Sequence, residues 1–304
     1  VYALRSAVDS PSLPVRLDPT AADQEPATLP SPGEVGTLPG RVVHAQAAAD
    51  DGVPVHYTLV LPDGASADDP APLLLWIHGG PLSSWNAWSW RWNPWLMAAR
   101  GYAVALPDPA LSVGYGRDFV GRGWGNWGDR PFTDLMAITD AVCARADVDA
   151  TRTAAMGGSF GGYMSNWVAT HTDRFRAIVT HASLWSLDQF LGTTDASAYW
   201  EREFGDPLHR PERYQANSPH RFVGQISTPM LVVHGDRDYR VPIGEALRLW
   251  FDLMRHDVEA KFLYFPDENH WVLSPGHARV WYQTVHAFLA QHVLDQKWER
   301  PELL

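Results

Sequence analysis

Short apolar runs alternate with segments of helical periodicity along most of this chain. Runs at 73–78, 102–107, 152–156, 177–181, 230–234 and 261–265 have the length and composition of buried strands. Between them, apolar residues recur at helical spacing over 132–143, 246–254 and 281–289. Alternating strands and helices predict an α/β fold with a mostly parallel sheet and helices on both of its faces.

The first part of the chain has a different pattern. Residues 10–40 are rich in Pro, Ala, Asp and Thr and have no sustained apolar period, which indicates a linker or an extended surface segment. The apolar runs 41–45 and 55–61 flank a polar turn and predict an antiparallel hairpin. We therefore expect regular structure to begin near Arg41.

Composition narrows the class of partner. The formal net charge of −11 disfavours nucleic acid as a partner, and no apolar run approaches the ~20 residues of a membrane-spanning helix. The single cysteine excludes an intramolecular disulfide and a zinc site built from several thiolates. A reducing compartment fits this cysteine content, so we expect a cytoplasmic protein, with secretion after processing as the alternative.

Cofactor motifs are missing from the sequence as well. No set of His, Asp and Glu has metal-ligand spacing, and no G-x-G-x-x-G opens a helix after a strand. We expect neither a metal nor another cofactor. The chain begins at Val1 without a methionine or a signal segment, which suggests a fragment or a processed product.

The strongest chemical signal is the segment Gly157–Gly162, which contains G-x-S-x-G around Ser159. A predicted strand precedes it and a predicted helix follows it, as the nucleophile elbow of a serine hydrolase requires. The small residues let strand and helix approach closely while the serine hydroxyl projects above the sheet. The alternative is a glycine-rich turn that holds an ordinary serine.

A nucleophilic serine needs a base and an orienting carboxylate, which follow it along the chain in this fold. Asp236 and Asp238 both come directly after the strand 230–234, and their spacing does not separate them. His270 lies in the loop after the last strand and is the expected base. Other strand-end histidines are expected to be structural: His78, His181 and His234.

An oxyanion hole needs two backbone N–H donors. Gly80 follows the buried strand 73–78 in an H-G-G loop, and Phe160 follows the serine. We expect their N–H groups to bind the oxyanion. The alternative for the loop is a tight turn that happens to hold two glycines.

Four motifs together resemble the prolyl oligopeptidase family of serine peptidases, in its acylaminoacyl-peptidase-like branch. They are GGSFGGYM at 157–164, HGGP at 78–81, HGDRDYRVP at 234–242 and NHW at 269–271. The resemblance covers Arg41 to the C-terminus and implies an α/β-hydrolase fold with a catalytic domain over 41–304. Its H-G-x-x-D pattern implies Asp238 as the triad carboxylate. Arg240 matches a position that holds a substrate carbonyl, although a solvated arginine would look the same.

Members of this family carry an N-terminal β-propeller. Val1–Ser6 resembles the end of a last propeller blade, so residues 1–40 are expected to be a propeller remnant or a linker. The expected partners are a peptide or small acyl substrate, a separate propeller chain of the same precursor, or further copies of this chain.

Tryptophans are concentrated directly after the H-G-G loop. The residues are Trp85, Trp88, Trp90, Trp92 and Trp95, with Trp124 and Trp127 further on. Three roles are open for these side chains: a wall of the substrate site, packing of the loop onto its neighbours, or a surface for a partner. Two aromatic residues are expected to contact substrate: Trp85 of this stretch and Tyr163, which follows the G-x-S-x-G segment.

The sequence as a whole predicts a serine peptidase that hydrolyses short or N-blocked peptides through Ser159, Asp238, His270 and an acyl-enzyme. The same triad would serve an esterase or amidase acting on a small molecule. A hydrolase-like binding protein without activity is the second alternative, which the intact triad disfavours.

Overall fold

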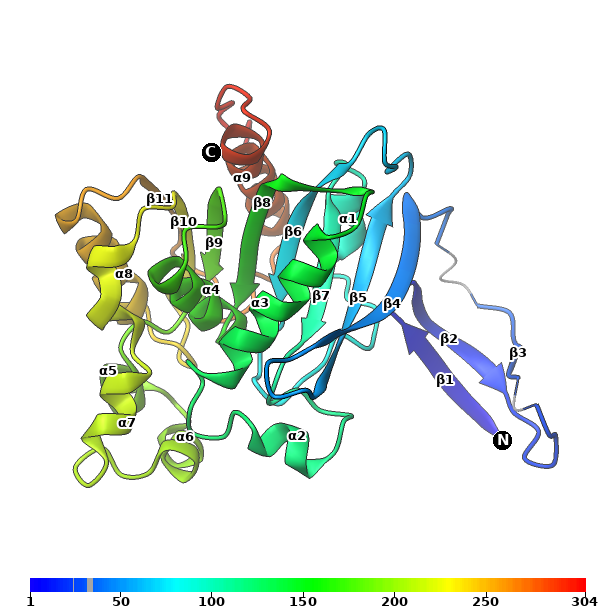
Figure 1. Ribbon diagram of the computed structural model, residues 1–304, viewed down its shortest axis with the longest axis horizontal. Helices are drawn as coiled ribbons and strands as arrows, with labels where there is room; N and C mark the ends of the chain where they lie inside the picture. Colours follow the sequence, from blue (N-terminus) through cyan, green and yellow to red (C-terminus); the bar gives the residue numbers. More distant parts are fainter. Residues whose placement is uncertain (24, 32–34) are drawn as a thin grey trace.

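A large twisted sheet forms the centre of the molecule (Figure 1). The structure is a computed structural model that describes residues 1–23, 25–31 and 35–304. The strand order is β11 (Ala260–Phe265), β10 (Met230–Gly235), β9 (Ala177–His181), β8 (Val148–Gly158), β6 (Ala71–Ile77), β7 (Ala103–Asp108), β5 (Pro54–Pro62) and β4 (Gly40–Ala48). Neighbours from β11 to β7 run parallel, whereas β5 pairs antiparallel with both β7 and β4. The predicted strands, the predicted hairpin and the mostly parallel sheet are confirmed.

Helices cover both faces of this sheet, as predicted (Figure 1). On one face lie α3 (Arg130–Cys143), α4 (Phe160–His171) and α8 (Gly244–Arg255); on the other lie α1 (Pro94–Ala98) and α9 (Pro275–Val293). Side chains of a strand point to alternate faces, so Leu75 of β6 packs with the first group and Trp76 with the second. Because both faces are covered, β6 is buried along its whole length.

Smaller helices lie in the connections. They are α2 (Arg117–Gly121), α5 (Leu187–Thr193), α6 (Ser197–Phe204), α7 (Pro211–Ala216) and the short 3₁₀ helix η1 (Pro219–Gln225). All but α2 belong to the insertion between β9 and β10.

The N-terminal segment departs from the prediction. Regular structure begins at Tyr2, because β1 (Tyr2–Ala7), β2 (Ser10–Arg16) and β3 (Ala27–Thr28) form a separate antiparallel sheet. Proline lacks the N–H that a ladder uses, so the composition of 10–40 argued against strands. Pairing with β1, which composition does not reveal, outweighs that preference. Residues 24 and 32–34 of the predicted linker lie outside the described residues.

The N-terminal hairpin is held against the rest of the chain through the tryptophan stretch. Trp95 donates its indole N–H to the carbonyl of Val8 at 2.9 Å, and the Trp88 N–H donates to the hydroxyl of Ser6 at 3.2 Å. Val8 itself is buried in the core on the α9 side. The division into residues 1–40 and a catalytic domain over 41–304 stays a prediction.

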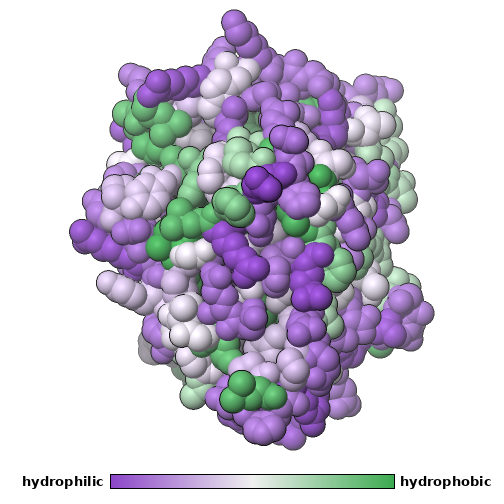
Figure 2. Space-filling view, turned by 90° about the vertical axis from the view of Figure 1, so that its left-hand side faces the viewer, coloured by the Kyte–Doolittle hydropathy of each residue, from purple (hydrophilic) through white to green (hydrophobic). Residues whose placement is uncertain are grey.

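β11 is an edge strand of the large sheet, and α8 packs beside β10 and β11 at this end of the sheet. Figure 2 faces this side and shows hydrophobic patches on a mainly hydrophilic surface. The apolar side chains that α8 exposes are Leu247, Phe251 and Met254. Association of further copies of this chain stays a prediction. None of the helices in the described ranges is long and apolar enough to cross a bilayer.

Glu245 of α8 holds the insertion in place. Its carboxylate accepts hydrogen bonds from the backbone N–H groups of Trp185 (2.7 Å) and Ser186 (2.8 Å) and from the Gln189 amide (2.7 Å). The group is fully buried, and burial raises the pKa of Glu245 from its ordinary 4.5 to about 7. The folded state therefore binds this proton more tightly than the unfolded state does.

The free energy of unfolding should fall as pH rises from 4.5 to 7, because the unfolded chain releases the Glu245 proton first. Glu245→Gln keeps an acceptor for the two N–H groups and cannot ionise. We expect the wild type to lose on the order of 3 kcal/mol relative to this variant across that range. Urea unfolding of both proteins at a series of pH values measures the difference, and parallel profiles would contradict it.

Candidate active site

Ser159 sits at the sharp turn between β8 and α4. Its backbone has φ of 59° and ψ of −120°, in the region that residues other than glycine rarely adopt. The turn is held by two backbone hydrogen bonds, from the Ser159 N–H to the His181 carbonyl at 3.0 Å and from the Tyr163 N–H to the Ser159 carbonyl at 2.8 Å. A strained serine that its surroundings hold in place is the geometry the elbow motif predicts.

The glycines of the elbow are required by close packing. A Cβ on Gly157 would overlap the backbone of Gly161, and a Cβ on Gly161 would overlap the carbonyl oxygen of Ile77. A Cβ on Gly162 would lie 2.6 Å from the carbonyl oxygen of His181. In each case the obstacle is backbone, which cannot rotate away. Helix α4 therefore approaches the ends of β6 and β9 more closely than side chains would allow.

Gly161→Ala is expected to destabilise the fold by about 1–3 kcal/mol and to lower kcat, because α4 must move and carry Ser159 with it. Gly192→Ala is the matched control, since Gly192 also lies in a helix but has nothing within 4 Å of its Cβ position. Urea unfolding and peptide turnover measure both effects. Equal stabilities of the two variants would contradict this account of the elbow.

Asp238 and His270 form a hydrogen-bonded pair. The His270 Nδ1 and Asp238 Oδ2 are 2.7 Å apart, and Asp238 is only 2% exposed. The other carboxylate oxygen, Oδ1, accepts the backbone N–H groups of Arg240 and Val241, both at 2.9 Å. Because a carboxylate only accepts, it selects the His270 tautomer that carries hydrogen on Nδ1 and leaves Nε2 free to accept.

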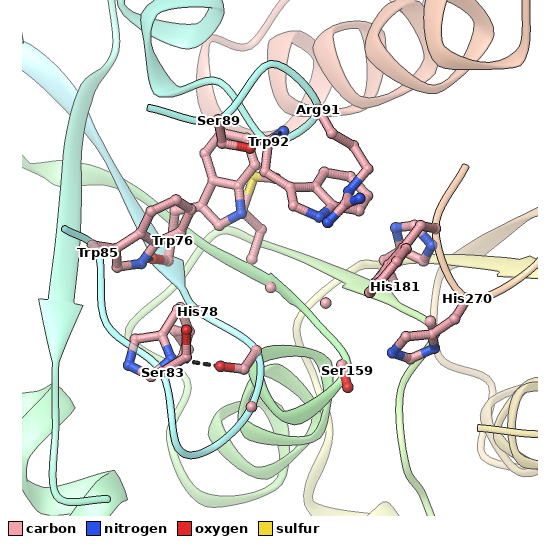
Figure 3. Close-up of a pocket in the computed structure, with 18 of the residues that line it drawn as sticks. Trp76, His78, Ser83, Trp85, Ser89, Arg91, Trp92, Ser159, His181 and His270 are labelled. Carbon is pink, nitrogen blue, oxygen red and sulfur yellow. Dashed lines mark hydrogen bonds between the residues drawn. The ribbon is translucent and has the colours of Figure 1, made fainter. Parts of the chain in front are cut away.

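The structure separates the two aspartate candidates. Asp236 is exposed, and its backbone N–H donates to the Phe265 carbonyl at 2.9 Å. Of the two aspartates, only Asp238 contacts His270. Ser159 and His270 line the same cavity and both appear in Figure 3. Within the described residues, no hydrogen bond joins them; such contacts often tighten only when substrate binds.

The two expected oxyanion donors occupy different surroundings. Gly80 lines the cavity with φ of +131°, and a Cβ there would lie 2.7 Å from the Leu82 nitrogen. Phe160 is the first residue of α4, so its N–H has no partner within the helix, while its ring is buried. The backbone of Phe160 is thus directed by the elbow and that of Gly80 by the loop after β6.

His78 holds that loop. Its Nδ1 lies 2.7 Å from the Gly79 carbonyl and its Nε2 lies 2.8 Å from the Ser112 hydroxyl. Because the carbonyl can only accept, Nδ1 donates, and burial lowers the pKa of His78 so that the ring stays neutral. His181 and His234 are also fully buried, and burial lowers the pKa of both. His78 and His234 hold backbone around the site, since His234 Nε2 lies 2.7 Å from the Val241 carbonyl. His181 Nδ1, in contrast, accepts the Trp281 indole N–H at 3.2 Å.

The cavity next to Ser159 has a volume of about 510 Å³, within the usual range for small-ligand sites. Trp85, Trp88 and Trp92 of the tryptophan stretch line it. Figure 3 shows Trp85 and Trp92. Trp85 is fixed by a 2.9 Å hydrogen bond from its indole N–H to the Trp76 carbonyl. By contrast, Trp90 is 68% exposed and Trp95 is buried. The stretch therefore serves both as cavity wall and as packing.

Two expected substrate contacts have other partners. Tyr163 is fully buried, its hydroxyl donates to the Asn217 carbonyl at 2.8 Å, and it does not line the cavity. The structure therefore does not bring Tyr163 to this cavity: its ring packs beside Trp127 in the core. Arg240 does line the cavity, but its guanidinium pairs with Asp195 at 2.7 Å.

The cavity also contains residues that the sequence did not predict to contact substrate, among them Arg91, Trp271 and Trp281. Trp271 follows His270 and Arg91 lies inside the tryptophan stretch, so their positions carried a signal, whereas Trp281 comes from α9 and is brought there by the fold. Nowhere in the described ranges do three His, Cys, Asp or Glu side chains gather as metal ligands.

Comparison with solved structures supports the fold. The Pyrococcus horikoshii acylaminoacyl peptidase has a TM-score of 0.87 over 98% of this chain and 49% of its own, at 22% identity. A Mycobacterium tuberculosis puromycin-hydrolyzing peptidase has a TM-score of 0.85 over 96% of this chain and 45% of its own, at 24% identity. The α/β-hydrolase fold predicted from the sequence is confirmed.

Curated relatives are closer in sequence. A probable dipeptidyl-peptidase 5 from Emericella nidulans is 38% identical over 246 residues, which is 78% of this chain and 34% of that protein. Dipeptidyl-peptidase 5 from Aspergillus fumigatus is 37% identical over 237 residues, 75% of this chain and 33% of its own. The chain thus spans about a third of the length of these relatives.

A family model described as the prolyl oligopeptidase family matches residues 88–296, most of the chain. That range contains the elbow at Ser159 and the hydrogen-bonded pair of Asp238 and His270. The resemblance seen in the four sequence motifs is therefore confirmed: the chain belongs to the prolyl oligopeptidase family.

Proposed function

We propose that this chain is the catalytic part of a serine peptidase, with Ser159 as nucleophile, His270 as general base and Asp238 as the residue that orients it. The observation that supports this proposal most directly is the hydrogen bond between Asp238 and His270, because His270 lines the same cavity as the strained Ser159. Membership of the prolyl oligopeptidase family supports peptide hydrolysis as the reaction.

The reaction follows from the hydrogen-bond pattern. With Nδ1–H held by Asp238, Nε2 of His270 takes the hydroxyl proton of Ser159 while Oγ attacks the scissile carbonyl. The N–H groups of Gly80 and Phe160 stabilise the oxyanion. His270 then gives the proton to the leaving amine, the C–N bond breaks, and an acyl-enzyme remains. Water, deprotonated by His270, releases the acyl group and restores Ser159.

The proposed substrates are short or N-blocked peptides. Names of the relatives and neighbours, dipeptidyl-peptidases and acylaminoacyl peptidases, support small peptides with either a free or a blocked amino end. The cavity of about 510 Å³ also suits a short segment of chain. A cytoplasmic location and association with a propeller chain remain predictions.

A peptide library with free and acylated amino ends, followed by mass spectrometry, tests this proposal. Wild type and Ser159→Ala are incubated in parallel, and matched esters of the same acyl groups form a second arm. Cleavage of peptides by the wild type alone supports a peptidase, and the ratio of blocked to free substrates gives its preference. Turnover of esters without any peptide would replace the proposal with an esterase, and peptide cleavage by both proteins would refute Ser159.

A further inference from the structure

Arg91 lies in the active-site cavity without a counter-charge. Its guanidinium carbon is 5.3 Å from the ring centre of Trp92 and 4.7 Å from that of Trp271. Its Nε is buried and has no hydrogen-bond partner, and among the described residues no carboxylate lies within ion-pair distance. Figure 3 shows the Arg91 side chain extending from the tryptophan stretch into the cavity.

A partly buried cation of this kind is costly unless an anion or polar ligand completes its surroundings. Other cavity-facing or buried arginines have such partners: Arg240 pairs with Asp195, and Arg122 pairs with the buried Asp134 at 2.7 Å. The two tryptophan faces hold the Arg91 guanidinium by cation–π contact and leave its polar edge unused. Its geometry suits a carboxylate, which a guanidinium can bind through two parallel hydrogen bonds.

The position of Arg91 indicates on which side of the scissile bond it would contact the substrate. In the proposed reaction His270 gives its proton to the leaving amine, so the leaving segment must lie next to His270. Trp271 is the adjacent residue in the chain, and Arg91 packs on its ring. Arg91 therefore lies toward the leaving side. It comes near the end of the connection between β6 and α1, whereas the oxyanion donor Gly80 comes near the start of that connection and Phe160 begins α4.

We propose that Arg91 binds a carboxylate on the leaving segment of the peptide substrate, which rests on the peptidase function proposed above. The carboxylate is either the C-terminus of a short leaving segment or an acidic side chain within it. In the first case the enzyme prefers short peptides whose scissile bond lies near a free C-terminus.

Binding can be measured without turnover in a Ser159→Ala background. The probes are N-acetylated oligoalanines of increasing length, each as the free acid, as the C-terminal amide, and as an amide with a glutamate in the last position. Calorimetry or tryptophan fluorescence gives each Kd. We expect the best carboxylate-bearing probe to bind about 10- to 100-fold more tightly than its matched amide, the usual effect of a charge-assisted hydrogen bond.

Arg91→Met should abolish this ratio while keeping apolar contact with the tryptophans, and Arg91→Lys should restore part of it. Arg279→Met, an exposed arginine of α9 outside the cavity, is the control and should keep the ratio. Melting temperatures of all variants verify folding. In the active enzyme, Arg91→Met should raise KM for carboxylate substrates far more than for the matched amides.

The outcomes separate the two proposals. Preference for the free acid assigns the C-terminal carboxylate, and preference for the glutamate amide assigns an acidic side chain. Equal Kd values for acid and amide, or a ratio that survives Arg91→Met, would overturn the role of Arg91 while peptide cleavage still supports the peptidase. An Arg91-dependent ratio without cleavage by the active chain would instead count against the peptidase.

Discussion

Replacing Ser159 by Ala is expected to lower kcat for peptide hydrolysis by about 10⁶-fold, because the members of a catalytic triad act as one unit. The change removes one oxygen atom and leaves the backbone turn in place. The hydrogen bonds of the elbow run through the Ser159 backbone, so the variant should fold like the wild type. Steady-state kinetics with a peptide found in the library measures the loss.

Binding should survive this substitution, since the cavity and its aromatic wall are unchanged. The melting temperature and the Kd for a product peptide serve as controls. A Ser159→Ala variant that keeps a large part of the wild-type kcat would show that another group performs the attack. A similar loss accompanied by a collapsed melting temperature would point to misfolding and would require the Kd to decide.

Asp238→Asn is expected to lower kcat by about 10⁴-fold, as the corresponding change does in other serine peptidases with this triad. Oδ1 of Asp238 accepts two backbone N–H groups, from Arg240 and Val241, so the amide oxygen of Asn must take that place. The amide NH₂ then faces Nδ1 of His270. His270 is forced into the tautomer with hydrogen on Nε2, which cannot take the Ser159 proton.

Asp236→Asn is the matched control, because Asp236 is two residues away and exposed but does not contact His270. It should keep kcat near the wild-type value. Comparing the two variants at several pH values also tests the tautomer argument. Equal losses of kcat in both variants, or a loss in Asp236→Asn alone, would show that Asp238 is not the carboxylate that orients His270.

The central part of the fold was predictable because local patterns and global packing agree there. A strand such as β6 is buried on both faces, so its continuous apolar run Leu73–Ile77 could be read directly. The helices α3, α8 and α9 show the periodicity of one covered face. The elbow was equally visible, because the close approach of α4 to β6 requires glycine at positions such as Gly161.

Features that depend on distant contacts could not be predicted. The β1–β2 hairpin contains Pro11 and Pro14, which resemble a linker, and only pairing across the turn turns it into a sheet. Tyr163 follows Ser159 by four residues, and α4 turns its side chain into the core beside Trp127. The isolation of Arg91 is likewise a property of the assembled cavity, since a sequence does not show which carboxylates are absent.

Trapping the acyl-enzyme tests the central claim most directly. The chain is mixed with an activated acyl ester of a cleaved peptide, quenched in acid within the turnover time, and digested for mass spectrometry. The account predicts the acyl group on Ser159 alone, at one group per chain, and none in Ser159→Ala. Peptide hydrolysis without any acylated Ser159, or with the acyl group on another residue, would contradict it.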